Sequence, residues 1–352
     1  LFLFYELLTL STYPLVAHQG NAEALRAGRL YLILLLGSSL LLFLPAIIAT
    51  WILAGTVDFR PGGILGGKVG DAGIALLFGL YVFGIGKAAV MPIHRWLPAA
   101  MVAPTPVSAL LHAVAVVKAG VFTILKVAVM IFGLDTLRDA GLSLALTALA
   151  GTTIVVASVI ALRQDNLKRR LAYSTVSQLS YVVLGVAVLT PISAVGAALH
   201  IAAHAAGKIT LFFAAGSIHT ATHLTEVSQL DGIGRRMPWT MGAFAVGALA
   251  MIGVPPTAGF LGKWYILGGA METANWLAVS VIVVSTVLNA AYYLPIVVRA
   301  FFREPPAAAH HHEAGEAPWP IVAALVVTGL ATVGLFFWSG LPYALATAMM
   351  GR

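Results

Sequence analysis

The sequence predicts an all-α membrane protein, a polytopic bundle of about ten transmembrane helices. Of its 352 residues, 60% are hydrophobic and only 9% are charged, whereas a soluble domain carries about 25% charged residues. Ten apolar stretches approach the roughly 20 residues that cross about 30 Å of hydrocarbon. They are 1–17, 30–55, 71–97, 106–133, 141–162, 171–190, 193–216, 240–267, 277–300 and 319–341. The linkers are short, so we expect one compact bundle rather than separate soluble domains.

The basic residues of the loops predict how this bundle is oriented. Threading the ten stretches through a membrane places eleven basic loop residues on one side and three on the other. The first set is Arg26, Arg29, Arg95, Arg163, Lys168, Arg169, Arg170, Arg235, Arg236, Arg299 and Arg303, and the second is Arg60, Lys68 and Arg138. Because cytoplasmic loops are enriched in Lys and Arg, the first side is expected to face the cytoplasm. The net charge of +7 therefore indicates orientation and not nucleic-acid binding.

Five lysines lie inside apolar stretches and are the strongest functional signal. They are Lys87, Lys118, Lys126, Lys208 and Lys263. A charge at bilayer depth costs about 2.5–3.5 kcal/mol on insertion scales, so such residues mark functional sites. Together with Glu6, His112, His200 and His204 they indicate a path for protons. Lys126 lies near the end of its stretch and is expected to reach the membrane surface instead.

Two stretches carry helix-breaking residues next to a lysine. The first has Gly84, Gly86 and Pro92 around Lys87, and the second has Gly253, Pro255, Pro256 and Gly259 before Lys263. Proline removes a backbone donor, and the freed carbonyls need partners that a membrane offers only beside protein or a wet cavity. We therefore expect broken helices near 84–98 and 252–263, each with a lysine beside its break. Paired breaks of this kind are typical of inverted repeats in transporters.

The residues His200, His204 and Lys208 follow one another at intervals of four on one predicted helix. Each step rises about 6 Å and turns about 40°, so the three side chains share a face. Histidine suits a relay because both ring nitrogens exchange protons near neutral pH. The alternative is a set of core polar residues that hydrogen-bond to neighbouring helices. His112 and Lys118, six residues apart on another helix, do not share a face.

Glu6 is the only acidic residue deep within a predicted span. Burial weakens the hold of an amine on its proton, and a nearby carboxylate strengthens it. We hypothesise that Glu6 pairs with Lys87 in one state and separates from it in another, which would drive the proton onward. A static structural salt bridge is the alternative.

The stretch that begins at Leu171 carries a polar stripe of four side chains, Ser174, Ser177, Gln178 and Tyr181. Such a stripe is suited to lining a hydrated channel, and it also suits hydrogen bonding between packed helices. The preceding residues Asp165, Asn166 and Lys168 are interpreted as capping and loop residues rather than as part of a conduit.

Several segments together resemble the antiporter-like membrane subunits of respiratory complex I, membrane-bound hydrogenases and Mrp-type cation/proton antiporters. They are 86–89 (GKAA), 92–98 (PIHRWLP), 103–112 (APTPVSALLH), 166–178 (NLKRRLAYSTVSQ), the series His200, His204 and Lys208, and 253–260 (GVPPTAGF) with Lys263. The resemblance implies a fold of about fourteen helices with two inverted five-helix repeats. Residues 1–133 would form the first half-channel, 141–300 the second, and 319–341 an additional helix.

The resemblance also assigns roles to individual residues. Glu6 matches the family glutamate, Lys87 and Lys263 the charged residues of the two broken helices, and Lys118 the lysine after the first half-channel. The series from His200 to Lys208 matches the central relay. The implied function is proton translocation by one subunit of a multisubunit complex in the prokaryotic inner membrane. Other membrane subunits, including paralogues, would be its partners, and the start of the family pattern is missing here.

Three alternatives remain open at this stage. The first alternative is a sodium/proton exchange subunit of an Mrp-type antiporter. The second is a structural membrane subunit whose channel does not conduct. The third is a stand-alone carrier of an organic solute. No cofactor or metal site is expected in this chain, so flavin, iron–sulfur clusters or quinone would belong to partner subunits. The run His310, His311 and His312 is interpreted as a solvated loop rather than a metal site. The sequence does not decide whether the chain is part of a translocating enzyme.

Overall fold

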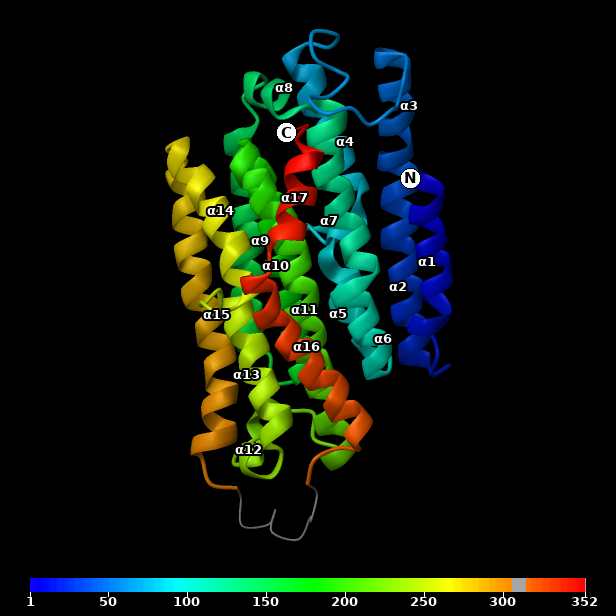
Figure 1. Cartoon of the computed structure of the whole chain (residues 1–352). Coiled ribbons are helices and arrows are strands. Elements are labelled where there is room, and N and C mark those ends of the chain that lie inside the picture. The colour runs from blue at the N-terminus through cyan, green and yellow to red at the C-terminus, as the bar shows by residue number, and fades with distance from the viewer. Residues whose placement is uncertain (306–314, 352) are drawn as a thin grey trace.

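The computed structural model describes residues 1–305 and 315–351, and the histidine run at 310–312 lies outside the described residues. The helices run side by side along the long axis of the molecule in a single bundle (Figure 1). All regular structure in these two ranges is helical apart from one isolated bridge between Asn166 and Glu226. The predicted all-α class is confirmed.

The helices follow the predicted stretches closely. In chain order they are α1 (Phe2–Val16), α2 (Ala22–Ser38), α3 (Leu44–Ala54), α4 (Asp71–Gly84), α5 (Trp96–Ala99), α6 (Thr105–Ala109), α7 (Val116–Val127), α8 (Leu134–Asp139), α9 (Ser143–Arg163), α10 (Leu167–Ala187), α11 (Pro191–Thr222), α12 (Ile233–Arg236), α13 (Pro238–Ile252), α14 (Ala258–Glu272), α15 (Trp276–Phe302), α16 (Trp319–Phe337) and α17 (Gly340–Met349). The π-helical turns Ser39–Phe43 and Leu110–Val114 join α2 to α3 and α6 to α7.

Within the described part of the chain, six helical segments are long and apolar enough to cross a membrane by length and composition. They are Ala22–Ala54, Thr105–Phe132, Ser143–Arg163, Pro191–Thr222, Trp276–Phe302 and Trp319–Phe337. The helices α1, α4 and α13 are apolar but shorter. Helix α10 is absent from this group because of its polar stripe. Eighteen of its 21 residues are buried inside the protein, so it does not need an apolar surface toward lipid.

Both predicted breaks are present. Helix α4 ends at Gly84, and the chain then passes through the 3₁₀ turns Gly86–Ala88 and Ile93–Arg95 before α5. In the second half, α13 ends at Ile252 and α14 begins at Ala258. Each break interrupts hydrogen bonding within a helix, so backbone carbonyls become available to side chains from other helices.

Glycine allows neighbouring backbones to approach closely at both breaks. A Cβ atom on Gly120 of α7 would lie 2.2 Å from the backbone nitrogen of Ala88, next to Lys87. A Cβ atom on Gly259 would lie 1.8 Å from the carbonyl oxygen of Ala250, in the last turn of α13. Only glycine at these two positions therefore allows the neighbouring backbone to lie as close as it does.

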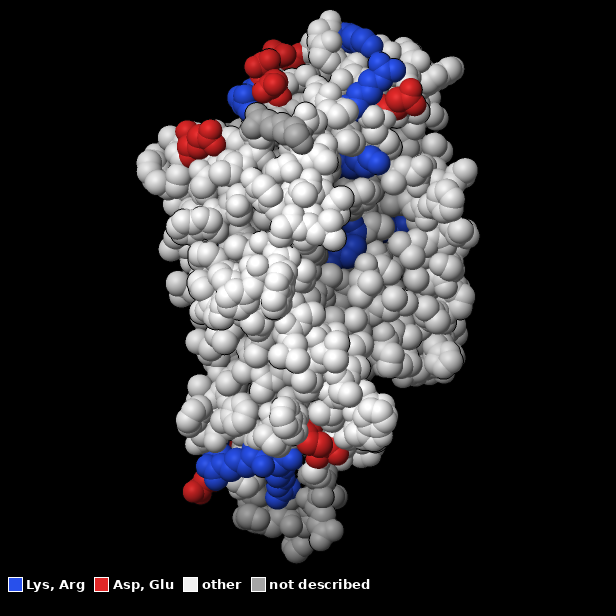
Figure 2. All heavy atoms as spheres, in the orientation of Figure 1, with Lys and Arg blue, Asp and Glu red and all other residues white. Residues whose placement is uncertain are grey.

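The charges collect at the ends of the bundle. Figure 2 shows Lys, Arg, Asp and Glu mainly at the two ends, with an almost uncharged surface between them. Arg299 forms an ion pair with Asp231 at one end, at 2.8 Å, and Arg138 pairs with Asp135 at the other, at 2.9 Å. This distribution is typical of a protein whose middle faces lipid.

We expect Gly120→Ala to destabilise the protein because the added methyl group meets backbone atoms that cannot rotate away. Overpacking of this kind costs about 1–3 kcal/mol. The melting temperature of the purified complex should fall. Gly79→Ala on α4 is the matched control because a Cβ there meets nothing within 4 Å. Equal melting temperatures for the two variants would contradict the close packing of α7 on the first break.

Candidate functional site

Lys87 is fully buried in the short turn that follows α4. Its Nζ donates a hydrogen bond to the carbonyl oxygen of Tyr5 on α1 and lies 3.3 Å from the centroid of the Tyr5 ring. The backbone N–H of Lys87 donates to the Tyr5 hydroxyl at 3.2 Å. One residue of α1 therefore contacts both the amine and the backbone of this lysine.

Glu6 is adjacent to Tyr5 but is not paired with Lys87 in this conformation. Both carboxylate oxygens of Glu6 are buried, and neither has a hydrogen-bond partner among the described residues. The Tyr5 carbonyl takes the lysine amine instead, although the charge of Glu6 still acts on Lys87. Glu6 and Lys87 thus form no ion pair in this structure, and the switch between a paired and a separated state stays a prediction.

Lys118 of α7 reaches across to the histidine series of α11. Its Nζ lies 2.6 Å from Nδ1 of His204, and both side chains are buried. His112, which precedes it in the chain, lies elsewhere and packs its ring against Phe212 at 5.1 Å between centroids. Both side chains thus contact α11, at positions eight residues apart, and the expectation that they do not share a face of their own helix stays a prediction.

The series on α11 is buried throughout. The rings of His200 and His204 lie 6.2 Å apart between centroids. Lys208 donates to the carbonyl oxygen of Leu171 at 2.9 Å, to the Tyr293 hydroxyl at 3.0 Å and to Oγ of Ser174. The lysine therefore has three oxygen partners from α10 and α15, which satisfies its amine in the protein interior.

The polar side chains of α10 make two kinds of contact, one with the candidate site and one with the neighbouring helix α9. Ser174 contacts Lys208, and Tyr181 lies 5.5 Å from the ring of His200. Gln178 donates through Nε2 to the Met251 carbonyl at 3.1 Å. Ser177 instead bonds to Ser158 of α9 at 2.9 Å, which is helix-to-helix hydrogen bonding. Three members of the stripe thus lie beside the buried series or the second break, and Ser177 does not.

Lys263 binds the backbone at the second break. Its Nζ donates to the carbonyl oxygens of Met251 at 2.8 Å and Ile252 at 2.9 Å, the last residues of α13. The same amine lies 4.7 Å from the centroid of the Tyr181 ring. The expectation that a lysine accompanies each break is confirmed, and here the lysine partners the freed carbonyls directly.

Sequence analysis missed two residues that contact the candidate lysines, Tyr5 beside Lys87 and Tyr293 beside Lys208. Tyr293 belongs to a polar group on the otherwise apolar α15 together with Ser285, Asn289 and Tyr292, all of them buried. Spacings of three and four residues within this group were a usable signal. The role of Tyr5 depends on its carbonyl, and backbone contacts leave no trace in residue identity.

The contacts join these residues into a continuous series. It runs from Lys118 to His204, then through His200 and Tyr181 to Lys263. The first step is 2.6 Å between nitrogen atoms, the next two are 6.2 and 5.5 Å between ring centroids, and the last is 4.7 Å from the Tyr181 centroid to Nζ of Lys263. Several buried polar atoms of the series, and of the nearby candidate residues His112 and Gln178, lack a hydrogen-bond partner within residues 1–305 and 315–351. They are both ring nitrogens of His112 and of His200, Nε2 of His204, Oε1 of Gln178 and the hydroxyl of Tyr181. Buried polar atoms usually have partners, so this concentration is characteristic of a functional site.

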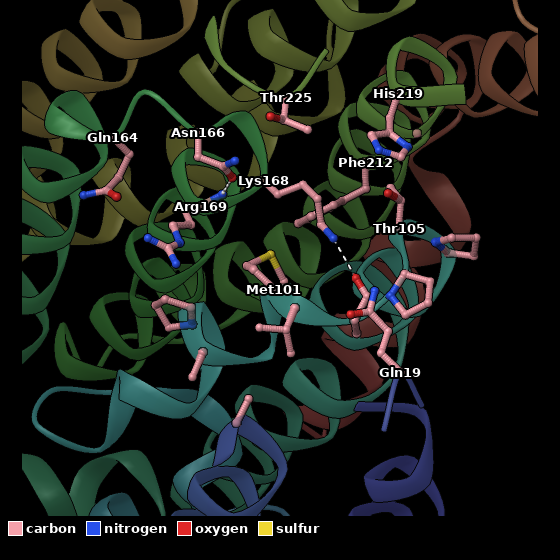
Figure 3. A pocket seen from close by; sticks show the side chains of 18 of the residues that line it. Gln19, Met101, Thr105, Gln164, Asn166, Lys168, Arg169, Phe212, His219 and Thr225 are labelled. Carbon is pink, nitrogen blue, oxygen red and sulfur yellow. Dashed lines mark hydrogen bonds between the residues drawn. The ribbon is translucent and has the colours of Figure 1, made fainter. Parts of the chain in front are cut away.

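A cavity of about 1580 Å³ opens on the side of the basic loops (Figure 3). Lys168 and Phe212 both line it, and Nζ of Lys168 donates to the carbonyl oxygen of Ala103 at 2.6 Å. Asn166 caps α10 as expected, accepting from the backbone of Arg169 at 3.1 Å. The interpretation of Lys168 as only a loop residue is incomplete, because its side chain lies against the cavity.

Comparison with known proteins agrees with this geometry. Residues 1–289 match the family described as NADH:quinone oxidoreductase/Mrp antiporter, TM. The chain belongs to this family. It is 33% identical over 353 residues to NADH-quinone oxidoreductase subunit N of Desulforudis audaxviator, covering 96% of this chain and 69% of that protein. It is 27% identical to one of the Na(+)/H(+) antiporter subunits of Alkalihalophilus pseudofirmus, with the same two coverages.

The fold of the family is equally clear in three dimensions. The structure of the Mrp complex from Dietzia sp. DQ12-45-1b contains a chain that superimposes with a TM-score of 0.86. The match covers 99% of this chain and 73% of that one at 23% identity. This protein is therefore a multi-pass membrane protein with the antiporter-like fold, which confirms the resemblance drawn from its motifs. The division into half-channel repeats stays a prediction.

We expect Lys263→Met to destabilise the second break. The variant keeps the length of the side chain but removes the donor to Ile252, whereas Met251 retains Gln178 as a partner. One buried unpaired carbonyl costs about 1–3 kcal/mol. The melting temperature of the purified complex measures the loss.

Lys126→Met serves as the control for the same chemical change. Lys126 is only partly buried, and its amine lies 4.2 Å from the centroid of the Phe59 ring. Its replacement should therefore change stability by less than about 1 kcal/mol. If both variants melted alike, the carbonyl contacts of Lys263 would not be stabilising the break.

Proposed function

We propose that this chain conducts protons across the membrane through its buried lysines and histidines, as one subunit of a larger complex. The contact between Lys118 and His204 carries the proposal, because it joins a lysine on α7 to the histidine series on α11. Histidine and lysine both exchange protons when buried beside suitable partners. Intramembrane ionisable residues in series are typical of proton relays.

The unpartnered atoms of the series support conduction rather than a purely structural role. A structural hydrogen-bond network satisfies its members, whereas both ring nitrogens of His200 and Nε2 of His204 have no hydrogen-bond partner among the residues that the structure describes. Such atoms are able to form and break hydrogen bonds with water, which proton transfer over separations of 5–6 Å requires. The separations between the rings of His204, His200 and Tyr181 are of this size.

The complex around the subunit is inferred from its relatives. The Desulforudis relative is named as part of an NADH-quinone oxidoreductase, and the Alkalihalophilus relative as part of a sodium/proton antiporter. We place this chain beside other membrane subunits in a prokaryotic inner membrane, with its basic loops in the cytoplasm. Any flavin, iron–sulfur cluster or quinone belongs to the partners in this proposal.

Removing either side of the central contact should stop conduction. We expect Lys118→Ala and His204→Ala each to lower proton flux by the order of a hundredfold, the usual effect of removing a proton-transfer group. Flux is measured as dye quenching in everted vesicles that contain the assembled complex, driven by its electron donor or by a sodium gradient. Because both act in one step, the double variant should be about as slow as the slower single variant.

Lys126→Ala is the control, since this lysine lies away from the series. Its flux should match the unmodified protein. Full flux in assembled complexes lacking Lys118 or His204 would reject conduction through this series and favour a structural subunit.

Sodium/proton exchange is the second candidate, supported by the identity to the Alkalihalophilus antiporter protein over 96% of this chain. The visible spectrum of the complex purified from its native membrane separates the two. Flavin and iron–sulfur absorbance is expected of a redox-driven complex. A colourless assembly would indicate that an ion gradient drives it, and dependence of proton flux on sodium would then identify the exchange.

A further inference from the structure

The histidine series of α11 continues toward the cavity on the basic side. Four residues after Lys208 comes Phe212, and four residues later comes Gly216, and both of these line the cavity. Phe212 is fully buried although it lines the cavity. Figure 3 shows Phe212 and Lys168 at the same part of the cavity wall.

The ring of Phe212 contacts the ring of His112. The two rings are 5.1 Å apart between centroids, and His112 is completely buried. Neither of its nitrogens has a partner among the described residues. His112 is thus a buried ionisable group in contact with an aromatic side chain that lines the cavity.

Lys168 is a lysine of the cavity wall, which it shares with Phe212, the residue whose ring contacts His112. Nζ of Lys168 donates one hydrogen bond, to Ala103, in the segment that leads into α6 and on to His112. An ammonium group has three donors, so others remain for water in the cavity.

We infer that Lys168 transfers protons between the cavity and His112, and that Phe212 is the barrier that keeps water in the cavity from reaching His112 directly. The inference rests on the proposed function. In the transfer, the ammonium of Lys168 gives one proton through water to a ring nitrogen of His112 and becomes a neutral amine. It then regains a proton from water in the cavity, so protons and charge balance. The opposite sequence returns a proton to the basic side.

Three substitutions at Lys168 separate proton transfer from charge and packing. Lys168→Met removes the amine, and Lys168→Arg keeps a charge and a donor but cannot release its proton. We expect both to lower proton flux about tenfold or more in vesicles with the assembled complex, because transfer by a side chain contributes at least that much. Lys168→His restores an exchangeable proton and should recover most of the flux.

Arg169→Gln is the matched control for charge at the cavity. It removes a positive charge from the neighbouring residue without removing an exchangeable proton, and should leave flux unchanged. If Lys168→Met failed to assemble, the arginine and histidine variants would still decide. Equal flux in the arginine and histidine variants would overturn the inference.

The role of Phe212 as a barrier is tested in the Lys168→Met variant, which lacks the amine. Phe212→Ala opens a path for water to His112, so the double variant of Lys168→Met with Phe212→Ala should conduct several times faster than Lys168→Met alone. No gain would overturn the role of Phe212. His204→Ala, measured in parallel, separates the two levels of the proposal. Loss of flux in His204→Ala with full flux in Lys168→Met would reject only the transfer step, whereas full flux in both would also reject conduction through the series.

Discussion

The structure depends on giving every buried lysine amine an oxygen or nitrogen partner at a depth where the membrane supplies none. An ammonium group in a medium of low dielectric is stable only when its donors are satisfied. Carbonyl oxygens serve Lys87, Lys208 and Lys263, and a histidine nitrogen serves Lys118. The carbonyls that accept from Lys263 are those left unpaired at the end of α13. The carbonyls of Tyr5 and Leu171 lie within α1 and α10, and a carbonyl oxygen has a second lone pair with which it can accept from a lysine.

The two breaks meet this requirement in different ways. At the second break, Lys263 follows the interruption and returns to the last carbonyls of α13, so the break and its partner lie in one segment. At the first break, Lys87 lies within the interruption and its amine is bound by Tyr5 of α1. A change in the position of α1 would therefore alter the contacts of Lys87, whereas Lys263 is held within its own segment. Lys87, whose contacts depend on the position of α1, is therefore the lysine whose environment changes more easily, and it is the one that lies beside Glu6.

The sequence was sufficient for the features that depend on local chemistry. Apolar length defined the spans, and glycine and proline marked both breaks. It was insufficient where the partner lies far along the chain, as for Lys118 and His204, separated by 86 positions. It also missed contacts made by backbone atoms, such as the Tyr5 carbonyl, and it placed Lys168 in a loop because a cavity exists only after the helices pack.

The contact between Lys118 and His204 has a consequence for how a proton passes from one residue to the other. At 2.6 Å the two nitrogens share a single hydrogen. A charged Lys118 donates, and Nδ1 of His204 must then lack a proton. A charged His204 carries protons on both nitrogens, so Lys118 must then be a neutral amine that accepts. The pair thus holds one positive charge in either state, because a second would place two cations on facing nitrogens with no acceptor between them. In the first state the neutral ring carries its proton on Nε2, so transfer of a proton from Lys118 to Nδ1 allows the proton on Nε2 to leave. Simple packing of these side chains would impose no such exclusion, and it is this exclusion that makes the contact between α7 and α11 a means of passing charge.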